Sequence, residues 1–557
     1  MLMKKKGFLL FVATLMTVLI LAACSGDSVD NEPEEPADEP GTEEGTGETA
    51  ESEGDAWVLG SEQLDITVFG NYDWYTMDQW GADEATANIQ ELYDVHLTAI
   101  DGGGNAAQRL STMIVDGNLP DIIWTDRGAD VERLREGGVL VAFDDYLDKY
   151  PNLKTWMSEE AMNLLRSEDG KLYQFPNWYN DQPFGNGGYL VHKGIYEELG
   201  SPSLETTDDL YEYLKLVQAE FPDVIPFETG VEAQGVGVLY SAFAEGRAPT
   251  DIRNQGVPNG DKLVSLFEDE NYVDSLKYAS KLFRERLMTQ DALTQSADDL
   301  EEKILNGRVA VFAGASVTTL GQRGHQQLIA DDPDSGYFVA NPIHKEGNNP
   351  NNTFPGDYNQ LGWNVNVITT SAEDPEKVFA FLDWLTGPEG QMLSMFGPEG
   401  VYWDGWIEEG VLPNFTDAYI NDQEGAKEME GGAASFQFNG NSKFLDNAKG
   451  SYEMQLPEDQ ITWTTYWQQE VLWPSQLDVT EFLNINPMPE SDEGIAQQRI
   501  GEIFEEARAK ALYAQSDEEV EQIVADANEQ AMAVGYQQVL DYKTTKWQEN
   551  LAAMQGN

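Results

Sequence analysis

The chain has 557 residues, of which 99 are Asp or Glu and 33 are Lys or Arg, so its formal net charge is −66. This charge excludes ordinary DNA or RNA binding, because neutralising phosphates needs a basic surface, and it excludes attachment to anionic lipid by charge alone. The single cysteine excludes an intrachain disulfide and a zinc site built from several cysteines.

The N-terminus has the pattern of an export signal. Lys4–Lys6 precede a nearly unbroken apolar run, 7–21. This run is shorter than the roughly 20 apolar residues that a membrane-spanning helix needs. The run leads into LAAC, which ends at the only cysteine of the chain, Cys24. This segment resembles the lipobox of bacterial lipoproteins, in which the cysteine is acylated and becomes the new N-terminus. We therefore expect residues 1–24 to be a lipoprotein signal peptide, with Cys24 as the lipidation site that ties the protein to the lipid bilayer.

An acidic segment, 25–60, follows the cysteine. It contains 13 acidic residues, no basic residue, and repeated Pro and Gly. Such a composition cannot bury enough apolar surface to fold, and its charges repel one another. We predict a disordered linker that holds the folded part away from the membrane.

The remainder alternates predicted strands with predicted helices. Period-two apolar patterns predict strands at Leu64–Phe69, Val95–Ile100, Asp121–Trp124, Tyr189–His192, Val309–Ala313, Tyr337–Asn341 and Trp363–Ile368. Helical periodicity predicts helices at Asp83–Tyr93, Ala106–Asp116, Thr207–Ala219, Tyr272–Arg286, Pro375–Leu385 and Gly494–Ala514. This order indicates an α/β fold with mainly parallel sheets flanked by helices.

Several motifs occur in the order found in one family. They are NLPDIIWTD (Asn118–Asp126), DGKLYQFP (Asp169–Pro176), YLVHKGIYEELG (Tyr189–Gly200), KILNGRVAVFAG (Lys303–Gly314), DPEKVFAFLDWL (Asp374–Leu385) and FGPEGVYW (Phe396–Trp403). With these motifs behind a lipobox, the chain resembles the extracellular solute-binding lipoproteins of ABC transporters. The resemblance is to the large oligosaccharide-binding branch of the family 1 binding proteins, of the aldouronate or polysaccharide-fragment type, and it covers about residues 61–545.

The resemblance implies a two-lobed fold of the periplasmic-binding-protein type (type II), with the lobes joined by crossover strands and a ligand in the cleft between them. On that template, lobe 1 comprises 61–188 and 345–400, and lobe 2 comprises 189–344 and 401–557. This expectation agrees with the general rule that ligands bind beyond the carboxyl ends of parallel strands.

No signature of catalysis, cofactor binding or metal binding is convincing. Gly102, Gly104 and Ala107 fit part of a dinucleotide-binding fingerprint, but we interpret these glycines as a tight strand-to-helix turn. Many relatives carry an Asp- and Asn-rich calcium loop after the helix equivalent to Thr207–Ala219. Here the connection is only EFPDVIPFE (Glu220–Glu228), so we expect no metal there. The sequence predicts neither a cofactor nor an enzyme.

Aromatic residues in irregular segments are the best candidates for ligand binding, because a flat ring can stack on the apolar face of a pyranose. Neighbouring polar groups can bind sugar hydroxyls. The predicted ligand-binding residues are Trp74, Tyr75, Trp124, Asp126, Arg127, Trp178, Tyr179, Trp363, Tyr402 and Trp403. For any one ring, packing in the core is the competing interpretation.

The functional prediction is a monomeric receptor, anchored by lipid on the extracellular face of the cell membrane, that binds an oligosaccharide and delivers it to the transmembrane subunits of an ABC permease. A surface lipoprotein enzyme acting on polysaccharide is the alternative, and a structural adhesin is a third class.

Overall fold

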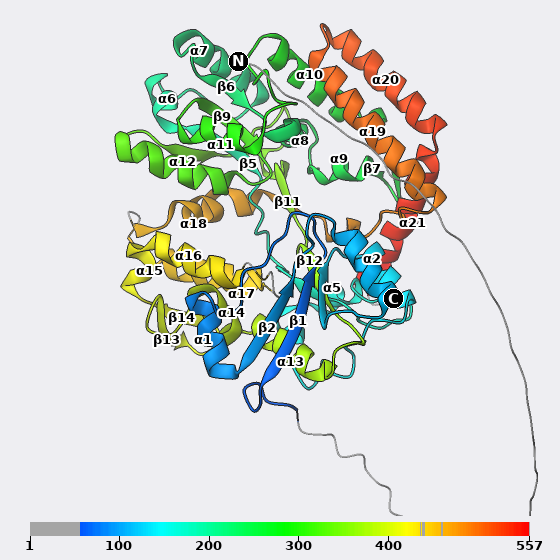
Figure 1. The fold of residues 1–557 in the computed structure, drawn as a ribbon. Coiled ribbons are helices and arrows are strands. Elements are labelled where there is room, and N and C mark those ends of the chain that lie inside the picture. The colour runs from blue at the N-terminus through cyan, green and yellow to red at the C-terminus, as the bar shows by residue number, and fades with distance from the viewer. Residues whose placement is uncertain (1–55, 435, 437–439, 458–459, 556–557) are drawn as a thin grey trace, which may run out of the picture. The chain divides into compact units, whose positions relative to one another are not determined.

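The computed structural model describes residues 56–434, 436, 440–457 and 460–555, and two mixed β-sheets organise this part of the chain (Figure 1). The first sheet has the order β2-β1-β3-β12-β4. Its strands are β1 (Leu64–Gly70), β2 (Val95–Ile100), β3 (Ile122–Thr125), β4 (Phe175–Asn177) and β12 (Asn364–Ile368). The second sheet has the order β10-β5-β9-β6 and consists of β5 (Gly188–His192), β6 (Ile225–Glu228), β9 (Val309–Gly314) and β10 (Tyr337–Ala340).

The prediction of mainly parallel sheets is wrong. In the first sheet β1 is parallel to β2 and β3, but β12 is antiparallel to both β3 and β4. In the second sheet β6 is parallel to β9, whereas β5 is antiparallel to β9 and β10. The reason lies in the chain path: β12 follows the whole second sheet in the sequence and re-enters the first sheet between β3 and β4.

Three two-stranded sheets complete the strands of the described residues. They are β7 (Gly256–Asn259) with β8 (Lys262–Ser265), β11 (Gly356–Tyr358) with β15 (Gln476–Asp478), and β13 (Trp403–Glu408) with β14 (Leu412–Phe415). The pair of β11 and β15 is parallel and joins segments that lie far apart in the sequence.

The strands and helices predicted from periodicity are present, with ends that shift by one or two residues. Asp83 begins α1 as its N-cap, because its carboxylate accepts the backbone N–H of Thr86. Helix α7 begins with a capping box formed by Thr206 and Asp209. These local signals explain why the helix starts could be read from the sequence.

Helices cover both faces of the first sheet. Side chains alternate along β1, so Ile66 and Val68 belong to one buried cluster and Phe69 belongs to another. The Phe69 face packs against α2 (Ala106–Asp116) and α3 (Ala129–Glu136). Among the described residues, the opposite face packs against seven helices: α1 (Glu84–Tyr93), α4 (Asn152–Trp156), α5 (Glu159–Asn163), α13 (Pro375–Thr386), α14 (Pro388–Phe396), α15 (Asp417–Asn421) and α17 (Ser442–Glu453). A further helix, α16 (Gln423–Ala434), packs on α1 and α14.

The second sheet is also covered on both faces. One cluster joins β5, β6 and β9 to α6 (Lys193–Glu198), α7 (Thr207–Glu220), α8 (Gly235–Phe243), α10 (Glu270–Arg284), α19 (Asp492–Tyr513), α20 (Asp517–Ala533) and α21 (Tyr536–Met554). The other joins this sheet to α11 (Ala297–Leu305), α12 (Val317–Asp331), α18 (Trp463–Trp467) and a π-helical turn at Gln468–Leu472. The short α9 (Thr250–Asn254) leads into β7.

Packing divides the C-terminal third of the chain differently from the predicted lobe boundaries. Residues 401–557 were expected to belong wholly to lobe 2. Instead, buried side chains from Tyr402 to Ala448 share the core of the first sheet, and only the later ones, from Val471 onward, share the cores of the second sheet. The reason is that α16 packs on α1 and α14, and α17 packs on α14, which keeps this stretch on the first sheet. The remaining boundaries stay predictions.

The N-terminal boundary also differs. The fold includes residues before the predicted boundary at 61, because Trp57 packs against the core of the first sheet. Its backbone N–H donates to the hydroxyl of Tyr150 at 2.8 Å, and its indole N–H donates to Glu62 at 3.1 Å. The predicted signal peptide with Cys24, and residues 25–55 of the predicted linker, lie outside the described residues. Across the residues that are described, no helix is both long enough and apolar enough to cross a membrane.

The buried carboxyl group of Asp383 should make the free energy of unfolding depend on pH. Its buried carboxylate accepts the backbone N–H groups of Asn152 and Leu153 at 3.1 and 2.8 Å, at the start of α4. Burial raises the pKa of Asp383 to about 6, although these hydrogen bonds oppose the shift. Because the folded protein binds this proton more tightly than the unfolded chain, lowering the pH from 8 to 5 raises the free energy of unfolding by about 1.4 kcal/mol through this group.

The Asp383→Asn variant lacks this contribution. The difference in free energy of unfolding between wild type and variant, measured by urea denaturation, should therefore change by that amount between pH 8 and pH 5. Asp223→Asn, at an exposed position, is the matched control and should show no such change. A pH-independent difference for Asp383→Asn would contradict the assignment.

Candidate ligand-binding cleft

Two adjoining cavities of about 490 and 280 Å³ form a cleft beside α16 and α17. They share Glu430, Asp446, Lys449 and Gln468. The larger cavity is lined by Trp178, Asn180, Phe184, Gly185, Asn186, Asp357, Tyr358, Asn359, Gly362, Trp363, Ser442 and Leu445 in addition to these four. The volume of the larger cavity lies in the range of sites that bind small molecules.

The walls of the cleft are formed by elements that pack on the core of the first sheet and by elements that pack on the core of the second sheet. Helix α17, which carries Asp446 and Lys449, packs on the core of the first sheet. The π-helical turn that carries Gln468 packs on the core of the second sheet. The amide of Gln468 donates to Asn186 at 2.9 Å, so the segment between β4 and β5 also contributes to the wall. A ligand in the cleft would contact elements of both cores.

Trp178 is held in the larger cavity by backbone geometry. Its φ angle of 56° is left-handed, and its N–H donates to the carbonyl of Gly440 at 2.7 Å. A Cβ atom added to Gly440 would collide with the indole ring, so only glycine allows this close approach. The ring is half-buried and lines the cavity. The backbone of Gly440 therefore supports the indole ring.

Trp363 lies immediately before β12 and is 47% exposed. Its N–H donates to the carbonyl of Asn177 at 3.0 Å, and Gly362 before it has a φ of 74°. The guanidinium of Arg127 donates to the carbonyls of Leu361 and Gly362 at 3.1 and 2.8 Å. These bonds fix the loop, so the ring of Trp363 is presented to the cavity.

Trp74 extends this aromatic surface outside the cavity lining. It is 60% exposed, and its ring is nearly parallel to that of Trp363, with an interplanar angle of 18° and centroids 6.2 Å apart. Trp178, Trp363 and Trp74 are thus the predicted aromatic residues whose rings remain accessible at or beside the cleft.

The other predicted aromatic residues are buried, and the expectation that they stack on a ligand is corrected. Trp124 is fully buried, with Tyr72 and Tyr75 at centroid distances of 4.3 and 4.7 Å, and with Trp74 and Trp363 at 6.0 and 5.4 Å. Tyr75 is buried in the same group. These rings support the exposed ones, because they form the layer against which Trp74 and Trp363 pack.

Tyr179, Tyr402 and Trp403 belong to the core beside the first sheet. The hydroxyl of Tyr179 is 2.7 Å from the hydroxyl of Thr386, and the indole N–H of Trp403 donates to the carbonyl of Gly397 at 2.9 Å. The hydroxyl or indole N–H of each residue therefore has a hydrogen-bond partner within the protein, as expected for buried Tyr and Trp. Their adjacency to irregular segments in the sequence did not reveal their burial.

Asp126 and Arg127 lie next to the aromatic surface, and Asp126 is exposed. Asp126 accepts the hydroxyl of Tyr72 at 2.6 Å, and neither residue lines the cleft. Burial lowers the pKa of the Arg127 guanidinium to about 10, partly opposed by the nearby charge of Asp126. These contacts position Tyr72 and the loop before Trp363, and binding of sugar hydroxyls by Asp126 and Arg127 stays a prediction.

The residues predicted from the sequence do not include the polar lining of the larger cavity. The side-chain oxygens Oδ1 of Asn359 and Oδ2 of Asp357 are buried and accept no hydrogen bond from the described residues. Asn180 and Asn186 line the same cavity. The available signal was the clustering of Asn and Asp next to Trp178 and Trp363, in NWYND and GDYNQ.

Charges gather where the two cavities meet. Lys449 lies 3.9 Å from Glu430 and one helical turn from Asp446. Burial lowers the pKa of the Lys449 ammonium, but the carboxylates of Glu430, Asp446 and Glu453 outweigh this effect and raise it. Burial raises the pKa of Asp446 to about 6, against the opposing charge of Lys449. The cleft therefore contains a compact charged group whose members stabilise one another.

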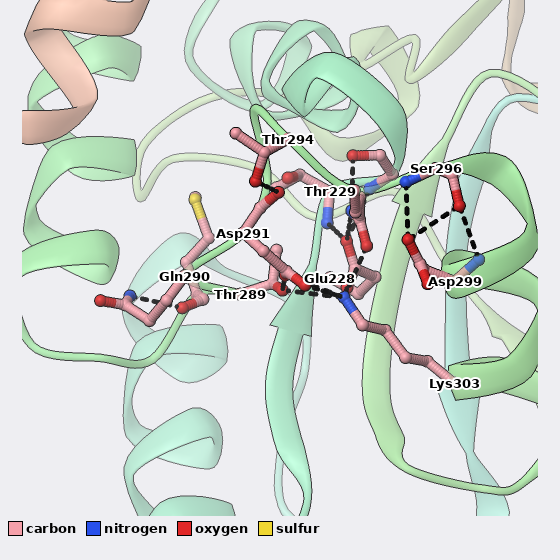
Figure 2. A network of polar contacts seen from close by, with 12 residues as sticks. Glu228, Thr229, Thr289, Gln290, Asp291, Thr294, Ser296, Asp299 and Lys303 are labelled. Carbon is pink, nitrogen blue, oxygen red and sulfur yellow. Dashed lines mark hydrogen bonds and ion pairs between the residues drawn. The ribbon is translucent and has the colours of Figure 1, made fainter. Parts of the chain in front are cut away.

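A second polar cluster lies at the end of β6 and does not line the cleft (Figure 2). The ammonium of Lys303 donates to Asp291 at 2.9 and 3.0 Å and to Gln295 at 2.6 Å, and it lies 3.4 Å from Glu228 and from Thr289. The oxygens that a cation would need are thus bound to a lysine. In the part of the chain that the structure describes, no group of three or more His, Cys, Asp or Glu side chains has a metal-binding arrangement.

The chain is similar to curated proteins over part of its length. The polygalacturonan/rhamnogalacturonan-binding protein YtcQ of Bacillus subtilis (strain 168) is 25% identical over 305 residues, which cover 53% of this chain and 58% of that protein. Lipoprotein LipO of the same strain is 24% identical over 338 residues, which cover 58% of this chain and 63% of that protein. The similarity therefore spans less than two thirds of either relative.

Solved structures resemble the chain over most of its length. The alginate-binding protein AlgQ2 without calcium ion has a TM-score of 0.65 at 15% identity, and the match covers 88% of this chain and 98% of that one. An HMO-binding solute-binding protein from Bifidobacterium longum infantis ATCC 15697 has a TM-score of 0.64 at 14% identity, covering 87% and 98%. FusA of S. pneumoniae in complex with kestose has a TM-score of 0.62 at 17% identity, covering 88% and 100%. These similarities show the two-domain fold of periplasmic binding proteins.

The family model for bacterial extracellular solute-binding proteins matches residues 76–392, more than half of the chain. With the fold just described, this match shows that the chain belongs to the bacterial extracellular solute-binding protein family.

Proposed function

We propose that the protein is the membrane-anchored extracellular substrate-binding component of an ABC importer, and that it binds an oligosaccharide in the cleft beside α16 and α17. The observation that carries the proposal is the lining of this cleft. Four aromatic rings, those of Trp178, Phe184, Tyr358 and Trp363, occur there together with several amide and carboxylate groups. Rings bind the apolar faces of sugars, and amides and carboxylates bind hydroxyl groups.

The expected affinity follows from the accessible rings. Covering roughly 50 Å² of sugar surface contributes about 1 kcal/mol per ring by area. Two or three such rings, with hydrogen bonds to the polar lining, support micromolar binding after the entropy cost of association. The names of the relatives support a carbohydrate ligand, since one is named for binding polygalacturonan and rhamnogalacturonan and one structure contains kestose.

Binding is proposed to close two lobes around the sugar. The cleft takes its walls from elements packed on both cores, so a ligand contacts both when they approach. Closure requires only that the sugar binds the closed arrangement better than the open one. The closed, loaded protein, acting as a monomer, would then be the form that the permease recognises.

The first test removes an accessible ring. Trp363→Ala should weaken oligosaccharide binding by about 1 to 3 kcal/mol, because the stacking area is lost. The melting temperature of the ligand-free protein should change little, since the ring is half exposed. Isothermal calorimetry with a sugar found in a melting-shift screen, beside ligand-free melting curves, measures both quantities.

Tyr513→Ala is the control for loss of an exposed aromatic residue, because Tyr513 lies on α19 and does not line the cleft. It should bind sugar like the wild type. If Trp363→Ala binds sugar with unchanged affinity, the assignment of the cleft as the sugar-binding site is wrong. If no sugar shifts the melting temperature, the proposed function is contradicted.

The second test concerns the anchor. If Cys24 is acylated, Cys24→Ala should move the protein from the membrane fraction into the medium, because a lipid chain is then missing from the N-terminus. Immunoblots of both fractions measure the distribution, and the electrophoretic mobility reports signal processing. A processed Cys24→Ala protein that stays on the membrane would exclude the lipid anchor.

Hydrolysis of a glycan is the second candidate function, because Glu430 and Asp446 both line the cleft and burial raises the pKa of Asp446 to about 6. Glycosidases use one carboxylic acid with a raised pKa and one carboxylate. Here Lys449 lies next to both carboxyl groups, which suits charge balance in a binding site. We expect no release of reducing ends from a glycan panel. Release that Asp446→Asn abolishes would establish the enzyme instead.

A further inference from the structure

The charges of the cleft are unevenly divided. Among the described lining residues, the acidic side chains are Asp357, Glu430, Asp446 and Glu453, and the basic ones are Lys427 and Lys449. No arginine lines either cavity among these residues. Arginine forks and free lysines are the groups that recognise carboxylates in proteins.

The cations in and next to the lining are largely engaged already. Lys449 lies 3.9 Å from Glu430 and also interacts electrostatically with Asp446 and Glu453. Outside the lining, the half-exposed Arg253 donates to Asp357 at 2.6 Å. Lys427 is exposed and lines only the smaller cavity. A carboxylate on a ligand would therefore find few cations and several like charges.

The unpartnered groups of the lining are acceptors. Oδ1 of Asn359 and Oδ2 of Asp357 are buried, and among the described residues no donor reaches them. A buried acceptor without a donor is costly, so these atoms favour a ligand that brings O–H groups. Sugar hydroxyls supply such donors, whereas an ionised carboxyl group supplies none.

We propose that the cleft selects uncharged oligosaccharides and discriminates against oligosaccharides of uronic acids. The inference rests on the proposed function and narrows its substrate class. Each uronate unit replaces a hydroxymethyl donor with a carboxylate, which meets Glu430 and Asp446 in a half-buried setting where like charges interact strongly. The acidic protein as a whole adds to this by lowering the local concentration of anionic ligands.

Matched pairs of ligands test the proposal. Each pair consists of a uronate trimer and the same trimer with its carboxyl groups reduced: galacturonate with galactose, glucuronate with glucose, and mannuronate with mannose. Dissociation constants for the purified full-length protein are measured by calorimetry in 0.05 M and 0.5 M NaCl. We expect the neutral member of a bound pair to bind at least about tenfold more tightly at low salt, and the ratio to shrink at high salt.

A charge variant tests the cause. Glu430→Gln should improve the affinity for the uronate member about threefold or more relative to the neutral member, since one repelling carboxylate is gone. Glu428→Gln, on the same helix but exposed and outside the lining, is the matched control and should leave the ratio unchanged. If Glu430→Gln lowers the melting temperature, Asp446→Asn replaces it as the test variant.

The outcomes distinguish failure of this inference from failure of the proposed function. Equal or tighter binding of uronate members overturns the inference but leaves the proposed function standing, because a sugar is still bound. An affinity ratio that is the same in Glu430→Gln, Asp446→Asn and wild type overturns the inference as well. No binding of any trimer counts against the proposed function and the inference together.

Discussion

Trp124→Ala is expected to lower the free energy of unfolding by about 3 to 5 kcal/mol, the range found for removing a fully buried large aromatic ring. The ring of Trp124 has no exposed surface, and four aromatic rings pack around it with centroid distances between 4.3 and 6.0 Å. Truncation leaves a cavity that rigid aromatic neighbours cannot fill by rotating into it. Urea denaturation followed by circular dichroism measures the loss.

Trp363→Ala is the matched comparison, because the two tryptophans are in contact but differ in exposure. It should lower the free energy of unfolding by less than about 1 kcal/mol, as for partly exposed side chains. The pair thus separates a ring that supports the surface from a ring that forms it. A Trp124→Ala protein with wild-type stability would show that this ring is not part of a packed core.

Lys303→Met is the other substitution with a large expected effect, a loss of about 3 to 5 kcal/mol, because removing one partner of a buried ion pair leaves the other charge uncompensated. Glu228 is fully buried, and Lys303 lies 3.4 Å from its carboxylate (Figure 2). The carboxylate also accepts the N–H groups of Thr229 and Gly230, each at 2.9 Å, which hold it in place. Thermal and urea unfolding measure the loss.

A double variant distinguishes charge from packing. Combining Lys303→Met with Glu228→Gln removes both charges and should recover most of the stability, as replacing a whole buried pair does. Lys510→Met, which breaks an exposed pair with Glu506, should cost no more than about 0.5 kcal/mol. A double variant as unstable as Lys303→Met alone would show that the lysine's packing, and not its charge, is what matters.

Local patterns in the sequence were sufficient for the strands and helices that were predicted, whereas others, such as β6 and α12, were not predicted. Val95–Ile100 and Ala106–Asp116 have the bounds predicted from periodicity, because side-chain alternation and helical spacing are set by neighbouring residues. The motif order also predicted the family that the model match over 76–392 shows. The direction of β12 was not predictable in this way, since it depends on the path of a chain that first builds the second sheet.

The predicted site residues lie in different surroundings in the structure, and their role in ligand binding stays a prediction. Trp178 and Trp363 line the cleft, but Trp124 is buried although it also lies at the end of a strand. All three have similar local sequence surroundings, with aromatic and polar neighbours. Which ring is covered depends on β12, which returns from far along the chain and pairs with β3. Burial is decided by such long-range pairings, and a single sequence does not contain their geometry.

The position of the charged residues in the cleft likewise depends on the tertiary structure and not on local sequence. From the sequence alone, α16 and α17 are polar helices of the kind that normally face solvent, and Glu430, Asp446 and Lys449 carry no motif. Packing of α17 on the core of the first sheet, opposite elements held by the second, turns this surface into a cavity wall. The sequence by itself determined the acidic composition, the local elements and the family. The tertiary structure decided which of the many acids meet at the cleft, because that depends on contacts between segments widely separated in the chain.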